Sequence, residues 1–127
     1  LAMLGSVPIG RIVFTERALP AVQPVRFVLD GTDVVIRTAA GSVPCAATGT
    51  TIVAFEADEF DAERCTGWSV TAVGPARTVT DPAERARLAR LPLPAWAPDG
   101  RDHFIVMRAE RLTGRRIPPV APVTRPA

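Results

Sequence analysis

The sequence has no lysine, tyrosine or asparagine, and it holds one histidine and two cysteines in 127 residues. All fifteen of its basic residues are therefore arginines. The three missing residue types have AT-rich codons, which indicates a GC-rich gene. A lysine missing from any one position therefore reflects either this compositional bias or a lost function.

The scarcity of cysteine and histidine argues against the common sites built from them. Cys45 and Cys65 have neither a C-x-x-C nor a paired zinc spacing, so we expect two free cytosolic thiols. His103 stands near no recognisable nucleophile signature, which favours a structural role. The acidic run from Glu56 to Asp61 lacks the spacing and glycine of a calcium loop, so a solvated turn is predicted. We therefore predict no metal site and assign no catalytic residue.

Charge and hydropathy argue against two classes of partner. The net charge is only +2, and Arg115 and Arg116 are the one adjacent basic pair, so no basic stripe faces a nucleic-acid backbone. No apolar run approaches the ~18 residues that span a bilayer, and no signal-peptide pattern opens the chain. The sequence predicts a cytoplasmic protein without nucleic-acid or membrane partners.

Short apolar runs separated by turn residues indicate a mainly β protein. Strands are predicted over residues 10–15, 25–29, 34–38, 51–57, 67–80 and 103–111. Turns are predicted at Arg17–Pro20 and Asp30–Asp33, and a bend at Gly74–Pro75. Six such strands suit a small antiparallel barrel, which forms one domain over residues 1–117. Residues 118–127 contain four prolines and predict a loosely packed tail.

One or two short helices accompany the strands. Asp81, Pro82 and Glu84 are an acidic N-cap, a proline at N1 and a glutamate at N3, which predicts a helix that runs to about Leu91. Residues 1–6 have the pattern of a helix end closed by Gly5.

The segment around Arg37 has the residue types of an anion site. The apolar strand core Val34–Ile36 is followed by Arg37 and Thr38, and a Gly41–Ser42 turn comes next. A guanidinium, hydroxyls and turn N–H groups together suit a phosphate. The residues alone leave a second interpretation open, in which this is an ordinary strand-end cation beside turn hydroxyls. Two interpretations also remain for Trp68 and Trp96. Each ring either packs in the core or stacks on a planar cofactor.

Several short motifs follow one another along the chain. They are Gly10-Arg11-Ile12-Val13-Phe14, Pro24-Val25-x-Phe27, Val35-Ile36-Arg37-Thr38-x-x-Gly41-Ser42, Val53-Ala54-Phe55-Glu56-x-Asp58, Thr66-Gly67-Trp68-Ser69-Val70, Trp96-Ala97-Pro98, Arg101-Asp102-His103-Phe104 and Thr113-Gly114-Arg115-Arg116-Ile117. This ordered set covers roughly residues 7–117. It resembles the pyridoxamine 5′-phosphate oxidase-like family of flavin-binding split barrels, in its actinobacterial type.

The resemblance implies a six-stranded Greek-key split barrel that forms a homodimer. It also implies two flavin mononucleotide (FMN) sites at the dimer interface. If the family's binding residues correspond to the matching positions here, the phosphate would be held by Arg37, Thr38 and Ser42. The isoalloxazine ring would lie along Val25, Arg26 and Phe27. Two further residues, Trp68 and Ser69, would lie near the same pocket. Trp96 would come from the partner subunit.

Two positions depart from the family pattern. Relatives commonly have Gly-Ser-Lys where this chain has Gly41-Ser42-Val43, so a charge-assisted contact to phosphate is missing. Relatives also often carry Asn or Thr at the position of Arg26. Arg26 either replaces the missing cation or fills the ring site and excludes flavin.

Two functions follow from the resemblance. The first is an FMN-dependent oxidoreductase acting on a small-molecule substrate, in which the cofactor carries the redox chemistry. Deazaflavin F420 is the alternative cofactor. The second is a non-catalytic protein of the same fold that binds flavin, F420 or haem, or an apo dimer with a structural role. Motifs for oxidation of pyridoxamine phosphate itself are not evident.

Overall fold

The computed structural model describes residues 3–38, 51–94 and 102–119 of the chain. Its elements are the 3-10 turn η1 (Leu4–Ser6), the strands β1 (Ile9–Glu16), β2 (Leu19–Asp30), β3 (Asp33–Thr38), β4 (Thr51–Asp61) and β5 (Thr66–Thr78), the helix α1 (Pro82–Leu88), and the strands β6 (His103–Arg108) and β7 (Arg111–Ile117). The predicted site residues Ser42 and Trp96, and most of the proposed tail, lie outside the described residues.

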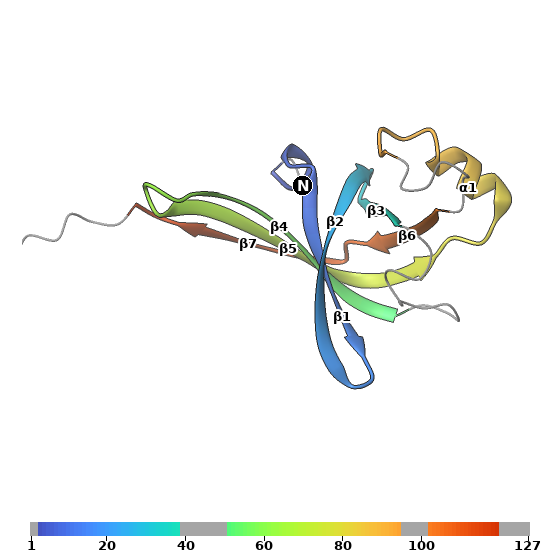
Figure 1. The fold of residues 1–127 in the computed structure, drawn as a ribbon, viewed down its shortest axis with the longest axis horizontal. Helices are drawn as coiled ribbons and strands as arrows, with labels where there is room; N and C mark the ends of the chain where they lie inside the picture. The colour runs from blue at the N-terminus through green and yellow to red at the C-terminus, as the bar shows by residue number, and fades with distance from the viewer. Residues whose placement is uncertain (1–2, 39–50, 95–101, 120–127) are drawn as a thin grey trace, which may run out of the picture.

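Six antiparallel strands close into a barrel, which confirms the predicted fold class (Figure 1). Their order is β4-β1-β2-β3-β6-β5, and the pairing of β4 with β5 closes the ring. Alternate residues of each strand face the interior. The core packs around Phe55 and Ile36, and the rings of Phe27 and Phe55 meet edge to face with centroids 4.6 Å apart.

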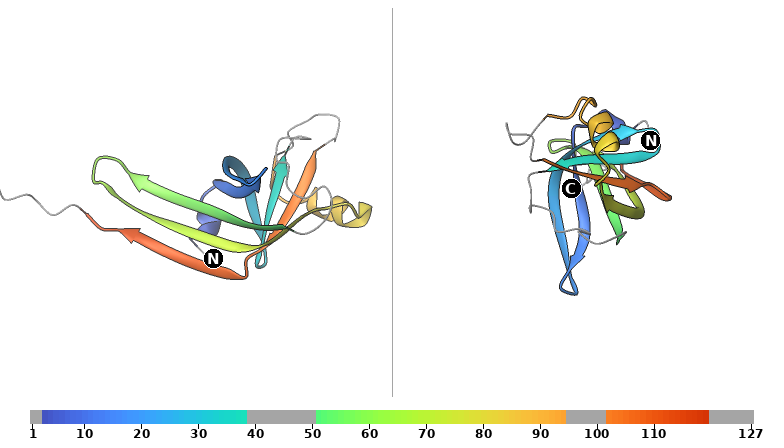
Figure 2. Two further views of the ribbon diagram at one scale, coloured as in Figure 1. Left: turned by 90° about the horizontal axis from the view of Figure 1, so that it is seen from below. Right: turned by 90° about the vertical axis from the view of Figure 1, so that its right-hand side faces the viewer.

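A three-stranded arm extends from the barrel (Figures 1 and 2). It consists of the distal parts of β4 and β5 together with β7, which pairs with β5 over Gly67–Val73. Beyond Gly74 and Pro75, β5 pairs with β6 instead. The predicted bend thus coincides with the point where β5 exchanges one partner strand for the other. All seven residues of β7 are exposed.

Helix α1 lies on the outer face of the sheet beside β3 and β6 (Figure 2). Its N-cap is Asp81, whose carboxylate accepts a hydrogen bond from the Glu84 N–H, as the sequence predicts. Leu88 is buried against Val35, Phe104 and other apolar residues of this face. Within the described ranges, no helix has the length and apolar character needed to cross a bilayer.

Some predicted boundaries are wrong. The segment Asp58–Asp61, expected as a turn, continues β4, because its backbone pairs with β5 through Asp61. Likewise, β2 begins at Leu19 and runs through Pro20 and Pro24. Both prolines are tolerated because this half of β2 pairs only with β1, so it is an edge strand.

The two ends of the fold also differ from expectation. The predicted last strand over residues 103–111 is shorter, because β6 ends at Arg108, and the segment after residue 110 forms a seventh strand, β7, that was not predicted. The N-terminal segment forms the 3-10 turn η1, and α1 ends at Leu88 instead of Leu91.

Candidate functional site

Arg37 and Thr38 lie at the end of β3 and face opposite sides of the sheet. Thr38 shares the interior face with Ile36, and only 4% of its surface is exposed. Arg37 shares the outer face with Val35, on the side that α1 covers. The two residues predicted to hold one phosphate therefore present their side chains to different sides of the strand.

The Arg37 guanidinium is held by three groups on the outer face. Its Nε donates to Oδ2 of Asp102 at 2.8 Å, and its Nη1 donates to the carbonyl oxygen of Leu93 at 3.2 Å. Its central carbon lies 5.1 Å from the ring centroid of Phe104, in cation–π geometry. The Arg37 side chain is 14% exposed and that of Asp102 only 1%. Arg37 therefore already has a carboxylate counter-charge within the chain.

Asp102 is the partner of a predicted site residue, and it was not singled out from the sequence. It directly precedes β6, and its carbonyl oxygen accepts a hydrogen bond from Arg85 Nη2 of α1 at 2.9 Å. Asp102 thus connects the end of β3 with α1. The only signal in the sequence was its place in the Arg101-Asp102-His103-Phe104 motif, which gives no partner.

The segment Val25–Phe27 of β2 turns two side chains inward and one outward. Val25 and Phe27 belong to the barrel core, whereas Arg26 is exposed. A ring lying along this segment would therefore meet its backbone and the Arg26 side chain. Two open hollows border the segment. One, of about 240 Å³, is lined by Ile9, Pro24, Val25 and Arg26, and the other, of about 420 Å³, by residues 5–8, 27–29 and 92.

Trp68 and Ser69 lie on the arm, on its opposite faces. Trp68 pairs with Glu59 on β4 and Arg116 on β7, and Ser69 follows it in the pleat. A hollow of about 240 Å³ is lined there by Met3, Trp68, Ser69, Val70, Gly114, Arg115 and Arg116.

The arm and the Arg37 region lie toward opposite ends of the molecule (Figure 1). The arm's β4–β5 turn forms one end, whereas Arg37 contacts Leu93 just beyond α1 at the other. One copy of the chain therefore does not bring Trp68 and Arg37 into a single site.

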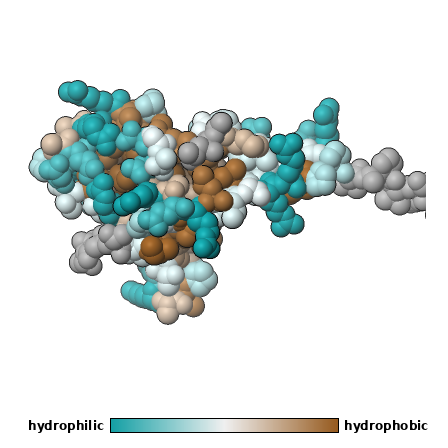
Figure 3. All heavy atoms as spheres, turned by 180° about the vertical axis from the view of Figure 1, so that it is seen from behind, coloured by the Kyte–Doolittle hydropathy of each residue, from teal (hydrophilic) through white to brown (hydrophobic). Residues whose placement is uncertain are grey.

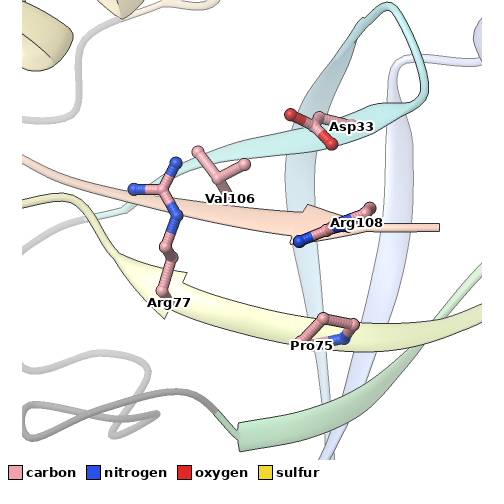
Figure 4. Close-up of a pocket in the computed structure, with 5 residues that line it drawn as sticks. All are labelled: Asp33, Pro75, Arg77, Val106 and Arg108. Carbon is pink, nitrogen blue, oxygen red and sulfur yellow. The ribbon is translucent and has the colours of Figure 1, made fainter. Parts of the chain in front are cut away.

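Another hollow, of about 290 Å³, opens on the outer face across β3, β6 and β5 (Figure 4). It is lined by Asp33, Pro75, Arg77, Val106 and Arg108. Arg77 donates two hydrogen bonds to Glu84 of α1, from Nη1 to Oε1 at 2.6 Å and from Nη2 to Oε2 at 2.8 Å. Asp33 supplies a further negative charge, so this mixed surface does not favour an anion. Among the predicted site residues that the structure describes, none lines it.

Glu56 and Asp58 form an ordered carboxylate pair that the predicted solvated turn did not anticipate. They are alternate residues of β4, and Arg11 Nη1 donates to both, at 3.0 Å to Glu56 and 2.6 Å to Asp58. Burial, together with the neighbouring Asp58, raises the pKa of Glu56, although the hydrogen bond from Arg11 acts in the opposite direction. The spacing of two between the carboxylates was the available signal of a strand.

The sequence model of the pyridoxamine 5′-phosphate oxidase family matches residues 1–116. The chain belongs to this family. An uncharacterized Mycobacterium tuberculosis protein of the curated set is 39% identical over 122 residues, which cover 92% of this chain and 80% of the relative.

Two solved structures show the same fold at substantial sequence identity. The FAD binding protein from Mycobacterium smegmatis is 38% identical, with a TM-score of 0.75 and 92% of each chain covered. A conserved protein of unknown function from Corynebacterium diphtheriae is 31% identical, with a TM-score of 0.75, covering 91% of this chain and 88% of that one. Family membership agrees with the resemblance that the ordered motifs predict.

Proposed function

We propose that the protein binds a flavin, with FMN as the preferred form, and that it acts as a flavin-dependent oxidoreductase on a small-molecule substrate. The observation that carries this proposal is the similarity to the M. smegmatis protein named as FAD binding, at 38% identity over nearly the whole of both chains. A bound flavin supplies hydride and electron transfer, so the protein needs no acid–base pair of its own. This agrees with the absence of a predicted catalytic residue.

The chain's own residues would bind and orient the flavin. Arg37 is proposed for the phosphate together with Ser42, whereas the buried Thr38 side chain faces the barrel interior and is not assigned to it. The exposed Arg26 and the backbone of Val25–Phe27 are proposed for the polar edge of the ring. A fixed ring leaves one face for the substrate, which is the positioning that this reaction class requires.

The site is proposed to form between two copies of the chain, with Trp68 and Trp96 supplied by the partner. The separation of the arm from Arg37 within one copy supports this arrangement. Large apolar side chains also reach the surface of the strands, in part near the junction of barrel and arm (Figure 3). They are Ile9, Leu19, Val22, Ile52, Phe60, Leu112 and Ile117. Exposed apolar strand surface of this kind is typical of a protein interface.

A non-catalytic role in binding flavin, F420 or haem is the second candidate. Val43 in place of lysine and the pairing of Arg37 with Asp102 favour it, because both reduce the positive charge that a phosphate would meet. The two candidates share the pocket and differ in turnover.

Measuring the bound cofactor, and then its turnover, distinguishes the oxidoreductase from the non-catalytic binding protein. We expect purified protein, or protein incubated with FMN, to show flavin absorption bands, and the ligand released by denaturation to have the mass of a flavin. FAD and F420 would be recognised by their masses. Turnover is then tested by reducing the bound flavin and adding a quinone or nitroaromatic acceptor. Reoxidation no faster than that of free flavin favours the binding role, and failure to take up any flavin contradicts the flavin site altogether.

A further inference from the structure

Among the residues that the structure describes, Asp102 is the one charged residue that is buried, and it contacts Arg37, a predicted cofactor residue. Its side chain is 1% exposed, and its Oδ2 lies 2.8 Å from Arg37 Nε. A buried carboxylate is retained only beside a compensating charge, and Arg37 provides that charge here. The pair is therefore a fixed part of the β3 end rather than a chance surface contact.

The remaining contacts of Arg37 do not depend on the charge of Asp102. The Leu93 carbonyl accepts from Nη1, and the Phe104 ring lies against the guanidinium. An amide at position 102 would still present an oxygen of nearly the same shape to Nε. Substitution by asparagine therefore removes the negative charge and leaves the acceptors that orient Arg37.

Resting on the proposed flavin site, we propose that Asp102 is a positioning residue that offsets the charge of Arg37. It thereby limits how much the flavin phosphate contributes to affinity. A phosphate near Arg37 meets a guanidinium already paired with a carboxylate, and the two anions repel each other in a region of low dielectric. With Val43 supplying no second cation, the ring contributes most of the affinity in the native protein.

Removal of the Asp102 charge should transfer the counter-ion role to the phosphate. In Asp102→Asn, Arg37 keeps its place and loses its partner charge, because it remains largely buried. A ligand phosphate then satisfies a cation that is otherwise uncompensated, so FMN gains affinity while riboflavin, which has the same ring and no phosphate, does not.

The test compares the dissociation constants of FMN and riboflavin, measured by flavin fluorescence. For the native protein we expect FMN to bind less than about tenfold more tightly than riboflavin. In Asp102→Asn the ratio of riboflavin to FMN dissociation constants should rise about tenfold or more, the size expected for a charge-assisted contact. A purely structural role for Asp102 would weaken both ligands together and leave the ratio unchanged.

Glu84→Gln is the matched control, because it neutralises the acid of another Arg–carboxylate pair on the same face. It should leave the ratio at the native value. An unchanged ratio in Asp102→Asn, with flavin still bound, overturns the role of Asp102. A native ratio above about a hundredfold also overturns it, and this measurement needs no variant to fold. If the native protein binds neither ligand, the proposed function itself is wrong.

Discussion

At Gly74 the backbone of β5 passes directly against the carbonyl group of Arg108 at the end of β6. A Cβ atom at this position would overlap the Arg108 carbonyl oxygen, and a backbone atom has little freedom to move away. We expect Gly74→Ala to lower the free energy of unfolding by about 3 kcal/mol, as overpacking does. Urea denaturation of the two proteins measures the difference.

Gly114 provides the matched control for Gly74. It also lies in a strand, but the nearest atom to an added Cβ is the Ser69 carbonyl oxygen at 4.0 Å. Gly114→Ala should therefore be neutral or stabilise by about 0.4–1 kcal/mol, since alanine restricts the unfolded chain. Equal losses in the two variants would contradict the close approach at Gly74.

The residues of the candidate site were identified by type, whereas their partners were not. A strand end with Arg37 and Thr38 was correctly placed, and strand alternation could have placed their side chains on opposite faces. The pairing of Arg37 with Asp102 joins positions 65 residues apart, and nothing in local sequence specifies it. Whether these residues hold a cofactor stays a prediction.

At the scale of elements, α1 depends on its attachments, because seven residues are too few for a stable isolated helix. Leu88 anchors it by burial, and two ion pairs tie it to the sheet. Arg77 binds Glu84 at 2.6 Å, and Arg87 binds Asp30 at 2.8 Å. The hydrogen bond from Arg77 lowers the pKa of Glu84 below its ordinary value of 4.5.

The lowered pKa of Glu84 predicts a pH-dependent contribution to stability. The folded protein holds the Glu84 proton less tightly than the unfolded chain does. The contribution is therefore fully present above pH 4.5 and is lost as the pH falls through the lowered value. Because the pair is partly exposed, we expect it to be worth at most about 1 kcal/mol. Urea unfolding of native protein and Glu84→Gln at pH 7, 5, 4 and 3 measures it.

The stability difference between these two proteins should shrink as the pH falls below 4.5. Glu16→Gln is the control, since Glu16 is exposed and forms no ion pair with any other residue that the structure describes. If the difference in free energy of unfolding between the native protein and Glu84→Gln stays constant from pH 7 to pH 3, the Arg77–Glu84 pair contributes nothing to stability.

Most elements were predictable because their signals are local. The apolar runs in β1 and β3 predicted both strands to within one residue of the observed bounds, and the N-cap types at Asp81 predicted the start of α1 but not its end. The extension of β4 through the acidic residues to Asp61 was not predictable, because long-range pairing with β5 overrides their low strand propensity. For β7, seven exposed residues leave no periodic pattern to detect.

At the scale of the whole molecule, a site shared between two copies predicts complementation. Arg37→Ala and Trp68→Ala should each weaken flavin binding, since each removes one contribution to both sites of a dimer. When the two variants are unfolded together and refolded, mixed dimers contain one intact site and one doubly defective site. About a quarter of all sites should then bind with native affinity, because half of the dimers are mixed.

Flavin titration of the mixture measures the fraction of tight sites, and sedimentation equilibrium at micromolar concentration checks that dimers are present. Each variant refolded alone is the control. A mixture that binds no better than its components would show that one copy builds the whole site, and a monomer would exclude the shared site directly.

The arrangement of the barrel could not be worked out from the residues alone. Strand order β4-β1-β2-β3-β6-β5 depends on contacts between distant segments, and the resemblance implied a six-stranded Greek-key barrel without giving this order. Neither the residues nor the resemblance predicted the arm, because β4 and β5 were predicted only as strands of the barrel and β7 was not predicted at all.

Because β5 belongs to both the barrel and the arm, insertions and deletions in this strand should be tolerated less well than substitutions. Since β5 pairs with β7 before Gly74 and with β6 after it, one added codon in this strand would turn Trp68 and every neighbour on one side of the insertion to the opposite face. Two added codons would restore the alternation. Single-codon insertions and deletions in β5 should therefore be eliminated among the descendants of this gene.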